Sequence, residues 1–346
     1  MRGLAELTTL RLGGPAERLA DAFGEAELVA AVREADAAGV PLLVLAGGSN
    51  VVVADAGFPG LVVRVRTRGV AATGGALEVA AGEDWDELVA RCVRSGLAGV
   101  ECLSGIPGSV GATPIQNVGA YGQEVAETIV AVRVLDRADG EVRELAAAEC
   151  GFAYRSSAFK RTPGRWVVLA VRFVLAERAV SAPIRYAELA RALGIEEGAT
   201  APLADVRGAV LALRRGKGMV IDAADPDSVS AGSFFTNPVL AAADFAALEA
   251  RARARLGGDV RVPRFPAPGG EVKTSAAWLI ERAGFTRGHG DPAAIAVSAK
   301  HTLALTNRGA GTTAQLVALA REIAAGVEEA FGVALEPEPV FVGHAW

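Results

Sequence analysis

Apolar residues follow two kinds of spacing along this chain. Some stretches repeat them every three or four positions, which predicts helices at residues 25–39, 85–95, 204–215, 240–256, 275–283 and 313–331. Other stretches are unbroken or alternating apolar runs, which predict strands at residues 40–46, 51–53, 61–66, 76–80, 129–136, 141–145, 166–175, 301–306 and 339–342. Asp84 is suited to cap the second helix and Gly39 to end the first. The mixture predicts an α+β or α/β ligand-binding protein.

Two glycine-rich segments, residues 45–51 and 105–122, interrupt this pattern. Neither has a hydrophobic period, and both place Gly, Ser and Asn where backbone amides can face a ligand. Glycine permits positive φ and a close approach of the main chain, and successive exposed N–H groups form nests for phosphate oxygens. Two such segments in one chain indicate a long cofactor that carries a pyrophosphate. The alternative is that each is an ordinary tight turn.

Length, charge and composition narrow the class of protein. The chain has 346 residues, 51% of them hydrophobic, which is enough for two or three domains with their own cores. The net charge of -5 and the lack of basic runs argue against nucleic-acid binding. The three cysteines form no C-x-x-C pair and suit a reducing compartment. The three histidines are too scattered to predict a metal site.

The sequence predicts neither a membrane span nor a secretion signal. The most apolar stretch, residues 40–53, is broken by glycine, serine and asparagine and is too short to cross a bilayer. The first residues lack the unbroken apolar region of a signal peptide. We therefore expect a cytoplasmic protein without membrane insertion, and a monomer.

Six short motifs, in order along the chain, carry a resemblance to a known family. They are GGSN at residues 47–50, the segment 105–122, YRSS at 154–157 with FK at 159–160, AGSFFTNP at 231–238, AWLI at 277–280 and LEPE at 335–338. Together they resemble the UDP-N-acetylenolpyruvoylglucosamine reductases, flavoenzymes of bacterial peptidoglycan precursor synthesis. The resemblance covers nearly the whole chain. Residues 184–186 (IRY) look like the tyrosine loop of the longer of this family's two subtypes.

The resemblance implies an α+β architecture. It comprises the FAD-binding fold of the vanillyl-alcohol-oxidase (PCMH) type and a smaller α+β substrate-binding domain. Consistent with this fold rather than a Rossmann fold, no G-x-G-x-x-G motif opens a helix. We expect a FAD-binding region at residues 1–220, with subdomains at about 1–68 and 69–220, and a substrate-binding domain at 221–335. Residues 336–346 should return toward the FAD-binding region.

The resemblance also implies the cofactors. FAD should bind the two glycine-rich segments without a covalent bond, because no histidine stands in the first of them. NADPH should be the hydride donor. The residues that the resemblance assigns to FAD are Gly47, Gly48, Ser49, Asn50, Val51, Gly105, Ile106, Pro107, Gly108, Gly111, Ala112, Ile115, Gln116, Asn117, Gly119, Ala120, Tyr121 and Gly122.

For the reaction, the resemblance implies that NADPH reduces the flavin. The flavin then passes a hydride to the enolpyruvyl group of UDP-N-acetylglucosamine enolpyruvate, giving UDP-N-acetylmuramate. Arg155 would hold the substrate carboxylate through its planar guanidinium. Ser233 would donate the proton, and Glu338 would stabilise the carbanion or enolate, with Glu336 as the alternative if the register is misread. Taken alone, each of these residue types is more common as a solvated, capping or turn residue.

The nucleotide sugar would be bound by a further set of residues. The resemblance assigns this role to Tyr121, Tyr186, Lys217, Asn237, Lys273 and His301. Lys217 suits a diphosphate, although a lysine beside glycine is also a common surface residue. His301, a lone histidine at the start of a predicted strand, is equally suited to a structural role.

Two other functions share part of this pattern. A related FAD-dependent oxidase of a small alcohol or sugar would use the glycine-rich segments but would not require the motifs at residues 231–238 and 335–338. A flavin-free protein that only binds a UDP-sugar would not need Arg155, Ser233 and Glu338 together. The colour of the pure protein and its reaction with the enolpyruvyl substrate distinguish these possibilities.

Overall fold

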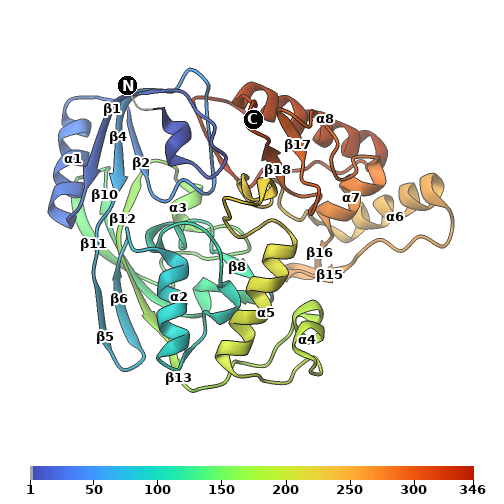
Figure 1. Ribbon diagram of the computed structural model, residues 1–346, viewed down its shortest axis with the longest axis horizontal. Coiled ribbons are helices and arrows are strands. Elements are labelled where there is room, and N and C mark those ends of the chain that lie inside the picture. The colour runs from blue at the N-terminus through green and yellow to red at the C-terminus, as the bar shows by residue number, and fades with distance from the viewer. Residues whose placement is uncertain (1–2) are drawn as a thin grey trace. The chain divides into compact units, whose positions relative to one another are not determined.

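The computed structural model describes residues 3–346, which form two compact units (Figure 1). Unit 1 contains Ala16–Gly48 and Phe58–Ile221, and unit 2 contains Gly3–Pro15, Ser49–Gly57 and Asp222–Trp346. The chain thus passes from unit 1 to unit 2 inside the first glycine-rich segment, between Gly48 and Ser49. The domain boundaries expected from the sequence stay a prediction.

The first sheet of unit 1 is parallel and leads into the first glycine-rich segment. Its order is β1-β4-β2, with strands β1 (Ala16–Ala22), β4 (Phe58–Val65) and β2 (Leu42–Leu45). Helix α1 (Glu25–Ala37) connects β1 to β2 and buries Leu28, Val29 and Val32, the face that the apolar spacing predicts. It ends just before Gly39, whose φ is +62°. The glycine-rich segment therefore begins at the carboxyl end of a strand at the edge of this sheet.

The second sheet of unit 1 is antiparallel. Its order is β11-β10-β12-β6-β5, with strands β11 (Glu141–Ala146), β10 (Ile129–Asp136), β12 (Trp166–Val174), β6 (Ala76–Ala80) and β5 (Val70–Thr73). Helix α2 (Trp85–Arg94) follows β6 and buries Trp85 and Val89 in the same core. Asp84 accepts a hydrogen bond of 2.9 Å from the amide of Glu87, which confirms its predicted capping role.

Two short elements lie within the second glycine-rich segment, the 3₁₀ turn η3 (Val110–Ala112) and strand β8 (Gly119–Ala120). The other short elements of unit 1 are β7 (Leu97–Ala98), the 3₁₀ turns η2 (Glu101–Leu103) and η4 (Val125–Glu127), β9 (Gln123–Glu124), α3 (Ala158–Arg161) and β13 (Ala176–Glu177). Helices α4 (Ala187–Leu193) and α5 (Leu203–Gly216) pack on each other. Leu189, Val206 and Val210 are buried in their small shared core.

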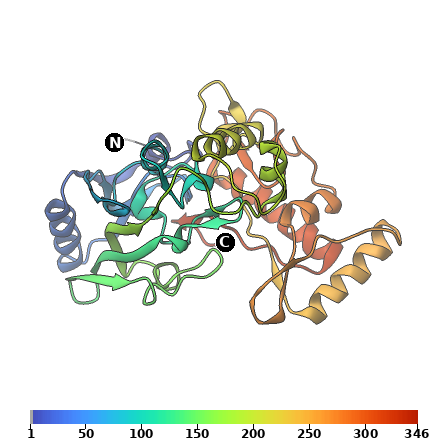
Figure 2. The same ribbon diagram turned by 90° about the horizontal axis from the view of Figure 1, so that it is seen from below.

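Unit 2 contains two long helices, one shorter helix and several short strands (Figure 2). The elements are η1 (Leu4–Leu7), β3 (Val51–Val53), η5 (Pro226–Ser228), β14 (Val239–Leu240), α6 (Ala242–Leu256), β15 (Phe265–Pro266), η6 (Pro268–Gly270), β16 (Val272–Lys273), α7 (Ala276–Ala283), β17 (Ile295–Val297), β18 (Leu305–Asn307), α8 (Thr313–Phe331) and β19 (Val340–Val342). The strands pair as β14-β16-β15, β17-β18 and β19-β3. Strand β19 runs parallel to β3, with Val340 opposite Val51, so the C-terminal segment is joined to the residues that follow the first glycine-rich segment.

The sequence prediction was wrong in one part of unit 2. The expected strand at residues 301–306 begins only at Leu305, because residues 301–304 form a turn in which the amide of Ala304 donates to the carbonyl of His301 at 3.1 Å. The apolar spacing also missed β1, β5, β17 and α4. Strand β5 is short and largely exposed, and helix α4 has only seven residues, so both lack the extended apolar pattern on which the prediction depends.

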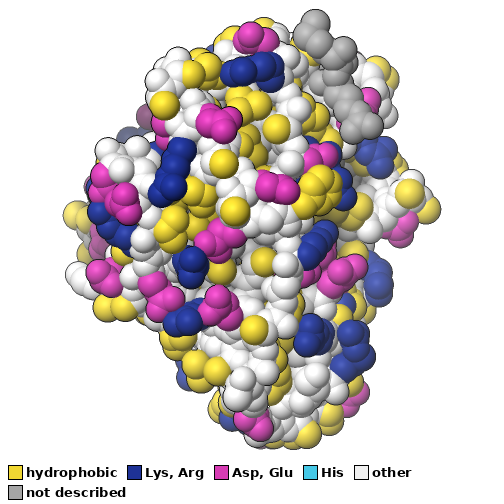
Figure 3. Space-filling view, turned by 90° about the vertical axis from the view of Figure 1, so that its left-hand side faces the viewer, with side chains coloured by type: hydrophobic (Ala, Val, Ile, Leu, Met, Phe, Trp, Pro, Cys, Tyr) yellow, Lys and Arg dark blue, Asp and Glu magenta, His cyan; other side chains and the backbone are white. Residues whose placement is uncertain are grey.

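On the face shown in Figure 3, acidic and basic side chains are interspersed. Within residues 3–346, no helix combines the length and the apolar character needed to cross a membrane.

A buried ion-pair cluster closes the end of β10. The carboxylate of Asp136 is buried and accepts hydrogen bonds from Arg165, at 3.0 Å from Nε and 2.8 Å from Nη2. Arg143 adds a third bond at 2.5 Å through Nη1. These arginines, Arg165 foremost, lower the pKa of Asp136 to about 2.

We expect Asp136→Asn to lower the free energy of unfolding by about 2 kcal/mol at neutral pH, because hydrogen bonds to a charged group are lost. A depressed folded pKa means that this stability is fully present above the unfolded pKa of about 4 and is lost as the pH falls through about 2. Urea denaturation of the Asp136→Asn and unaltered proteins should show that the difference between their free energies of unfolding becomes smaller as the pH is lowered through this range. The matched control is Asp139→Asn, which removes a more exposed carboxylate that also pairs with Arg143. This substitution should lower the free energy of unfolding by less than Asp136→Asn does. A difference that did not change with pH would contradict the role of the ionised carboxylate.

Candidate active site

The two glycine-rich segments meet at Gly47 and Gly108 of unit 1. A Cβ atom on Gly47 would lie 2.7 Å from the Cα of Gly108, which is far inside van der Waals contact. Gly48 and Gly108 also have φ of +63° and +128°, values that favour glycine. The main chains can approach this closely only because Gly47 lacks a side chain.

The second segment is fixed to the start of α2. The amide of Gly105 donates to Oδ1 of Asp86 at 2.5 Å, and Arg207 donates to both oxygens of that carboxylate, at 2.6 and 2.8 Å. Burial tends to raise the pKa of Asp86, but the Arg207 and Gly105 hydrogen bonds outweigh it and lower that pKa. The amides of Val110 and Gly111 donate to backbone carbonyls at 2.9 Å, so they serve to anchor the segment.

Ser109 lies at the contact between the two segments and was missed by the sequence analysis. Its backbone nitrogen would be 3.3 Å from a Cβ atom on Gly47. Its side-chain oxygen is buried and meets no hydrogen-bond partner within residues 3–346. A buried hydroxyl without a partner is unfavourable, so this position suits a polar ligand. Its place directly after Gly108 was the signal available in the sequence.

Backbone strain is concentrated around the second segment. Among residues 3–346, four non-glycine residues have positive φ, and three of them are Asn117 (+47°), Tyr121 (+49°) and Arg155 (+50°). Such conformations are unfavourable and are maintained only where surrounding contacts hold them, which is common at functional sites. The Asn117 side chain shows such contacts, since it bonds to Glu124 at 2.7 Å and to the amide of Ala126 at 3.1 Å. The side-chain amide of Asn117 therefore fixes the conformation of the segment through internal hydrogen bonds.

Arg155 lies against this same segment. Its Nη2 atom donates to the carbonyl of Gly119 at 2.7 Å, and Nη1 makes a longer bond of 3.5 Å to the carbonyl of Asn117. The guanidinium also stands over the Tyr154 ring, 5.3 Å from its centroid. Lys160 donates to the Arg155 carbonyl at 3.1 Å. The predicted catalytic arginine and the predicted cofactor segment are thus neighbours in unit 1.

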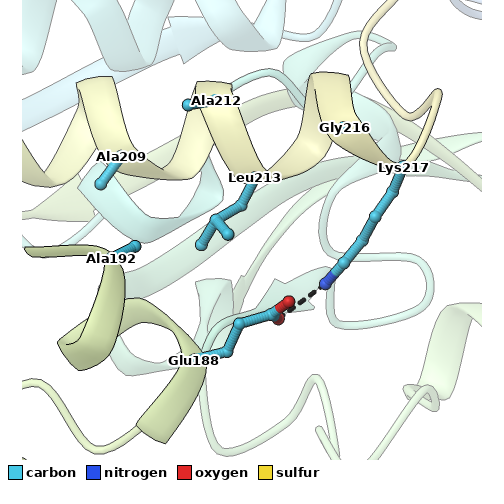
Figure 4. Close-up of a pocket in the computed structure, with 7 residues that line it drawn as sticks. All are labelled: Glu188, Ala192, Ala209, Ala212, Leu213, Gly216 and Lys217. Carbon is cyan, nitrogen blue, oxygen red and sulfur yellow. Dashed lines mark hydrogen bonds and ion pairs between the residues drawn. The ribbon is translucent and has the colours of Figure 1, made fainter.

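Three of the predicted substrate residues also cluster in unit 1. The rings of Tyr121 and Tyr186 meet edge to face with centroids 5.3 Å apart, and the Lys217 ammonium lies 5.6 Å from the Tyr121 centroid. Lys217 pairs with Glu188, at 2.6 Å (Figure 4). Burial raises the pKa of Tyr121 to about 12, so its hydroxyl stays protonated at neutral pH. Glu188 is a second polar residue that the sequence analysis missed.

Unit 2 brings Ser233 and Glu338 into adjacent segments. The amide of Glu338 donates to the carbonyl of Phe234 at 2.8 Å, and the amide of Phe234 donates to Leu303 at 2.7 Å. Asn50 belongs to the same group, since its Nδ2 atom donates to the carbonyl of Glu338 at 3.3 Å. The alternative residue Glu336 is exposed, whereas Glu338 is half-buried. Main-chain hydrogen bonds therefore hold Phe234, the residue after Ser233, and join it to Glu338.

The other predicted substrate residues of unit 2 lie further along the chain. Asn237 accepts a hydrogen bond of 3.0 Å from the amide of Ala276 at the start of α7. Lys273 is in β16, opposite Val239. His301 lies in the turn before β18, where its amide donates to Ser298 at 3.2 Å. None of these contacts tests a role in substrate binding.

The predicted FAD residues are divided between the two units. Gly47, Gly48 and the whole of residues 105–122 belong to unit 1, and Ser49, Asn50 and Val51 belong to unit 2. Within unit 1, Ile106, Ile115 and Ala120 pack against the main core. Their packing against the core therefore holds the segment in place on unit 1.

Two domain families match the chain, a FAD binding domain over residues 20–146 and a UDP-N-acetylenolpyruvoylglucosamine reductase C-terminal domain over residues 225–342. The UDP-N-acetylenolpyruvoylglucosamine reductase of Streptomyces coelicolor is 60% identical over 344 residues, 99% of this chain and 89% of that protein. The one from Thermobifida fusca is 58% identical over 98% of this chain and 96% of that protein. The chain belongs to the UDP-N-acetylenolpyruvoylglucosamine reductase family.

A solved structure supports the same conclusion about the fold. The crystal structure of the UDP-N-acetylenolpyruvylglucosamine reductase from Thermus caldophilus matches with a TM-score of 0.67 and 27% identity, over 99% of this chain and 97% of that chain. The predicted family and the α+β architecture with a FAD-binding domain are confirmed.

The residues present in this reductase-family chain fit FAD. The matched FAD binding domain includes Gly47 and Gly48 and all of residues 105–122. Where Gly47 approaches Gly108 the segments present a backbone surface without side chains, and the buried hydroxyl of Ser109 beside it has no hydrogen-bond partner within residues 3–346. Such a surface suits the pyrophosphate of a dinucleotide.

We expect Gly47→Ala to weaken FAD binding about tenfold or more, because the new methyl group separates the two segments and overpacking costs about 1–3 kcal/mol. The FAD dissociation constant, measured by flavin fluorescence, tests this. The control is Gly208→Ala, since Gly208 lies in α5 with nothing within 4 Å of its Cβ position and should leave FAD affinity unchanged. Equal FAD affinity in Gly47→Ala and the unaltered protein would rule out the contact as part of the site.

Proposed function

We propose that this protein reduces UDP-N-acetylglucosamine enolpyruvate to UDP-N-acetylmuramate, with FAD as its non-covalent cofactor and NADPH as hydride donor, in peptidoglycan precursor synthesis. The observation that carries the proposal is that a FAD binding domain and the reductase C-terminal domain are present in one chain, which is 60% identical to a named reductase. When bound, FAD supplies the hydride transfer that no amino-acid side chain provides. The protein's own residues supply binding, orientation and a proton.

Arg155 is proposed to hold the substrate carboxylate. A guanidinium can form two parallel hydrogen bonds to a carboxylate, and its charge offsets the negative charge that builds there during reduction. The bond of 2.7 Å from Nη2 to the Gly119 carbonyl supports this role, because it fixes the orientation of the group beforehand.

Ser233 is proposed to donate the proton that completes the reduction, and Glu338 to hold charge or a proton beside it. The main-chain bond of 2.8 Å between Glu338 and Phe234 supports a joint role, since it keeps the two residues in adjacent segments. A hydroxyl whose neighbouring residue is fixed by main-chain hydrogen bonds loses less freedom when it reacts. Glu338 is preferred over Glu336 because it is the less exposed of the two.

The proposal is tested by separating the two halves of the reaction. Pure protein should be yellow, and anaerobic NADPH should bleach its flavin absorbance. Adding UDP-N-acetylglucosamine enolpyruvate should then restore it. Colourless protein that cannot be loaded with FAD would favour a UDP-sugar-binding protein, and reduced flavin that reacts with oxygen but not with this substrate would favour an oxidase.

We expect Ser233→Ala to leave the reduction of flavin by NADPH nearly intact and to slow its reoxidation by the enolpyruvyl substrate by about 10²–10⁴-fold, the usual contribution of a positioned proton donor. Stopped-flow absorbance measures both steps in one sample, so the first step is the internal control. Equal losses in both steps would mean that Ser233 positions ligands and does not donate the proton.

We expect Arg155→Lys to slow the substrate half-reaction by at least about tenfold although the charge is kept, because lysine cannot form the paired hydrogen bonds of a guanidinium. The same stopped-flow measurement tests this. Arg161→Lys is the matched control, since Arg161 lies nearby in α3 and bonds to Ser156 and Gly151 at the surface. A rate equal to that of the unaltered protein would remove Arg155 from the reaction.

A further inference from the structure

A cavity of about 420 Å³ lies between α4 and α5 of unit 1 (Figure 4). Its walls are mostly small apolar side chains, and Glu188 and Lys217 point toward one another at one side of it. Glu188 comes from the first turn of α4, and Lys217 is the C-cap of α5. Among the described residues that line this cavity, the only two charged side chains therefore form a pair with each other.

The pair is short but not fully shielded from water. Lys217 Nζ lies 2.6 Å from Oε2 of Glu188, and the side chains are 30% and 37% exposed. The same ammonium lies over the ring of Tyr121. An anion that approaches Tyr121 and Lys217 thus meets a lysine whose charge is already balanced by an acid of the same chain.

We propose that Glu188 competes with a nucleoside diphosphate for the Lys217 ammonium and so limits the affinity of the site for nucleotides. The inference rests on the proposed function, in which Lys217 binds the diphosphate of the substrate. A diphosphate that bonds to the Lys217 ammonium must take the place of the Glu188 carboxylate, and the loss of that ion pair subtracts from the free energy of binding. Neutralising Glu188 leaves the ammonium fully available to the ligand.

A purely structural role for Glu188 predicts the opposite effect. Glu188 is two residues after Tyr186, so its bond to Lys217 also ties the start of α4 to α5. If that tie served only to keep Tyr186 in place, removing it would loosen the tyrosine and weaken nucleotide binding. The sign of the change in affinity therefore distinguishes competition from support.

The experiment is a calorimetric titration of the FAD-loaded full-length protein with UDP. We expect Glu188→Gln to tighten UDP binding about two- to fivefold, the range given by a partly exposed ion pair. Lys217→Met should weaken binding, and Glu188→Gln should have no further effect in the Lys217→Met background, because the two residues act through one contact. Glu197→Gln, a neutralisation at an exposed position after α4, is the matched control and should leave affinity unchanged.

Each other outcome has a definite meaning. Unchanged or weaker UDP binding in Glu188→Gln would overturn the inference. Tightening that persists in the Lys217→Met background, or that Glu197→Gln reproduces, would also overturn it, because general surface charge would then be the cause. If the unaltered protein does not bind UDP at all, the proposed function falls and the inference with it.

Discussion

The contact between Gly47 and Gly108 is the constraint on which the rest of unit 1 depends. At that point two main chains touch where any side chain would collide, so the polypeptide on both sides must be held firmly. The hydrogen bond from Gly105 to Asp86 holds one side, and Arg207 in turn holds Asp86. The Ser109 hydroxyl lies next to this contact, buried and without a hydrogen-bond partner within residues 3–346.

Two charged side chains are likewise held in one orientation before a ligand binds. Arg155 is bound to the Gly119 carbonyl and Lys217 to Glu188, so neither cation is left to adopt many rotamers. Groups fixed in this way lose little entropy when a ligand arrives. The two partners differ in kind, because Arg155 bonds to a backbone carbonyl and Lys217 forms an ion pair with the Glu188 carboxylate.

In unit 2 the backbone does the positioning. Ser233 and Glu338 are more than a hundred residues apart in sequence, yet one amide-to-carbonyl bond beside each keeps their segments together. The parallel pairing of β19 with β3 further fixes the segment that directly follows Glu338. Sequence motifs identified both residues through resemblance to the reductase family, but their adjacency could not be derived from spacing, because no local period links them.

The sequence by itself determined the elements whose signal is local. The apolar face of α1, the cap at Asp84 and the strand β10 follow from residues within a few positions of each other, and all three are found as predicted. Only the tertiary structure decided that β18 begins at Leu305, that Ser109 has an unpartnered hydroxyl and that Glu188 neutralises Lys217. Each of these depends on which distant residue lies across a contact. The local sequence pattern indicates the secondary structure that a residue favours, but the packing of the whole chain determines which distant residue it contacts.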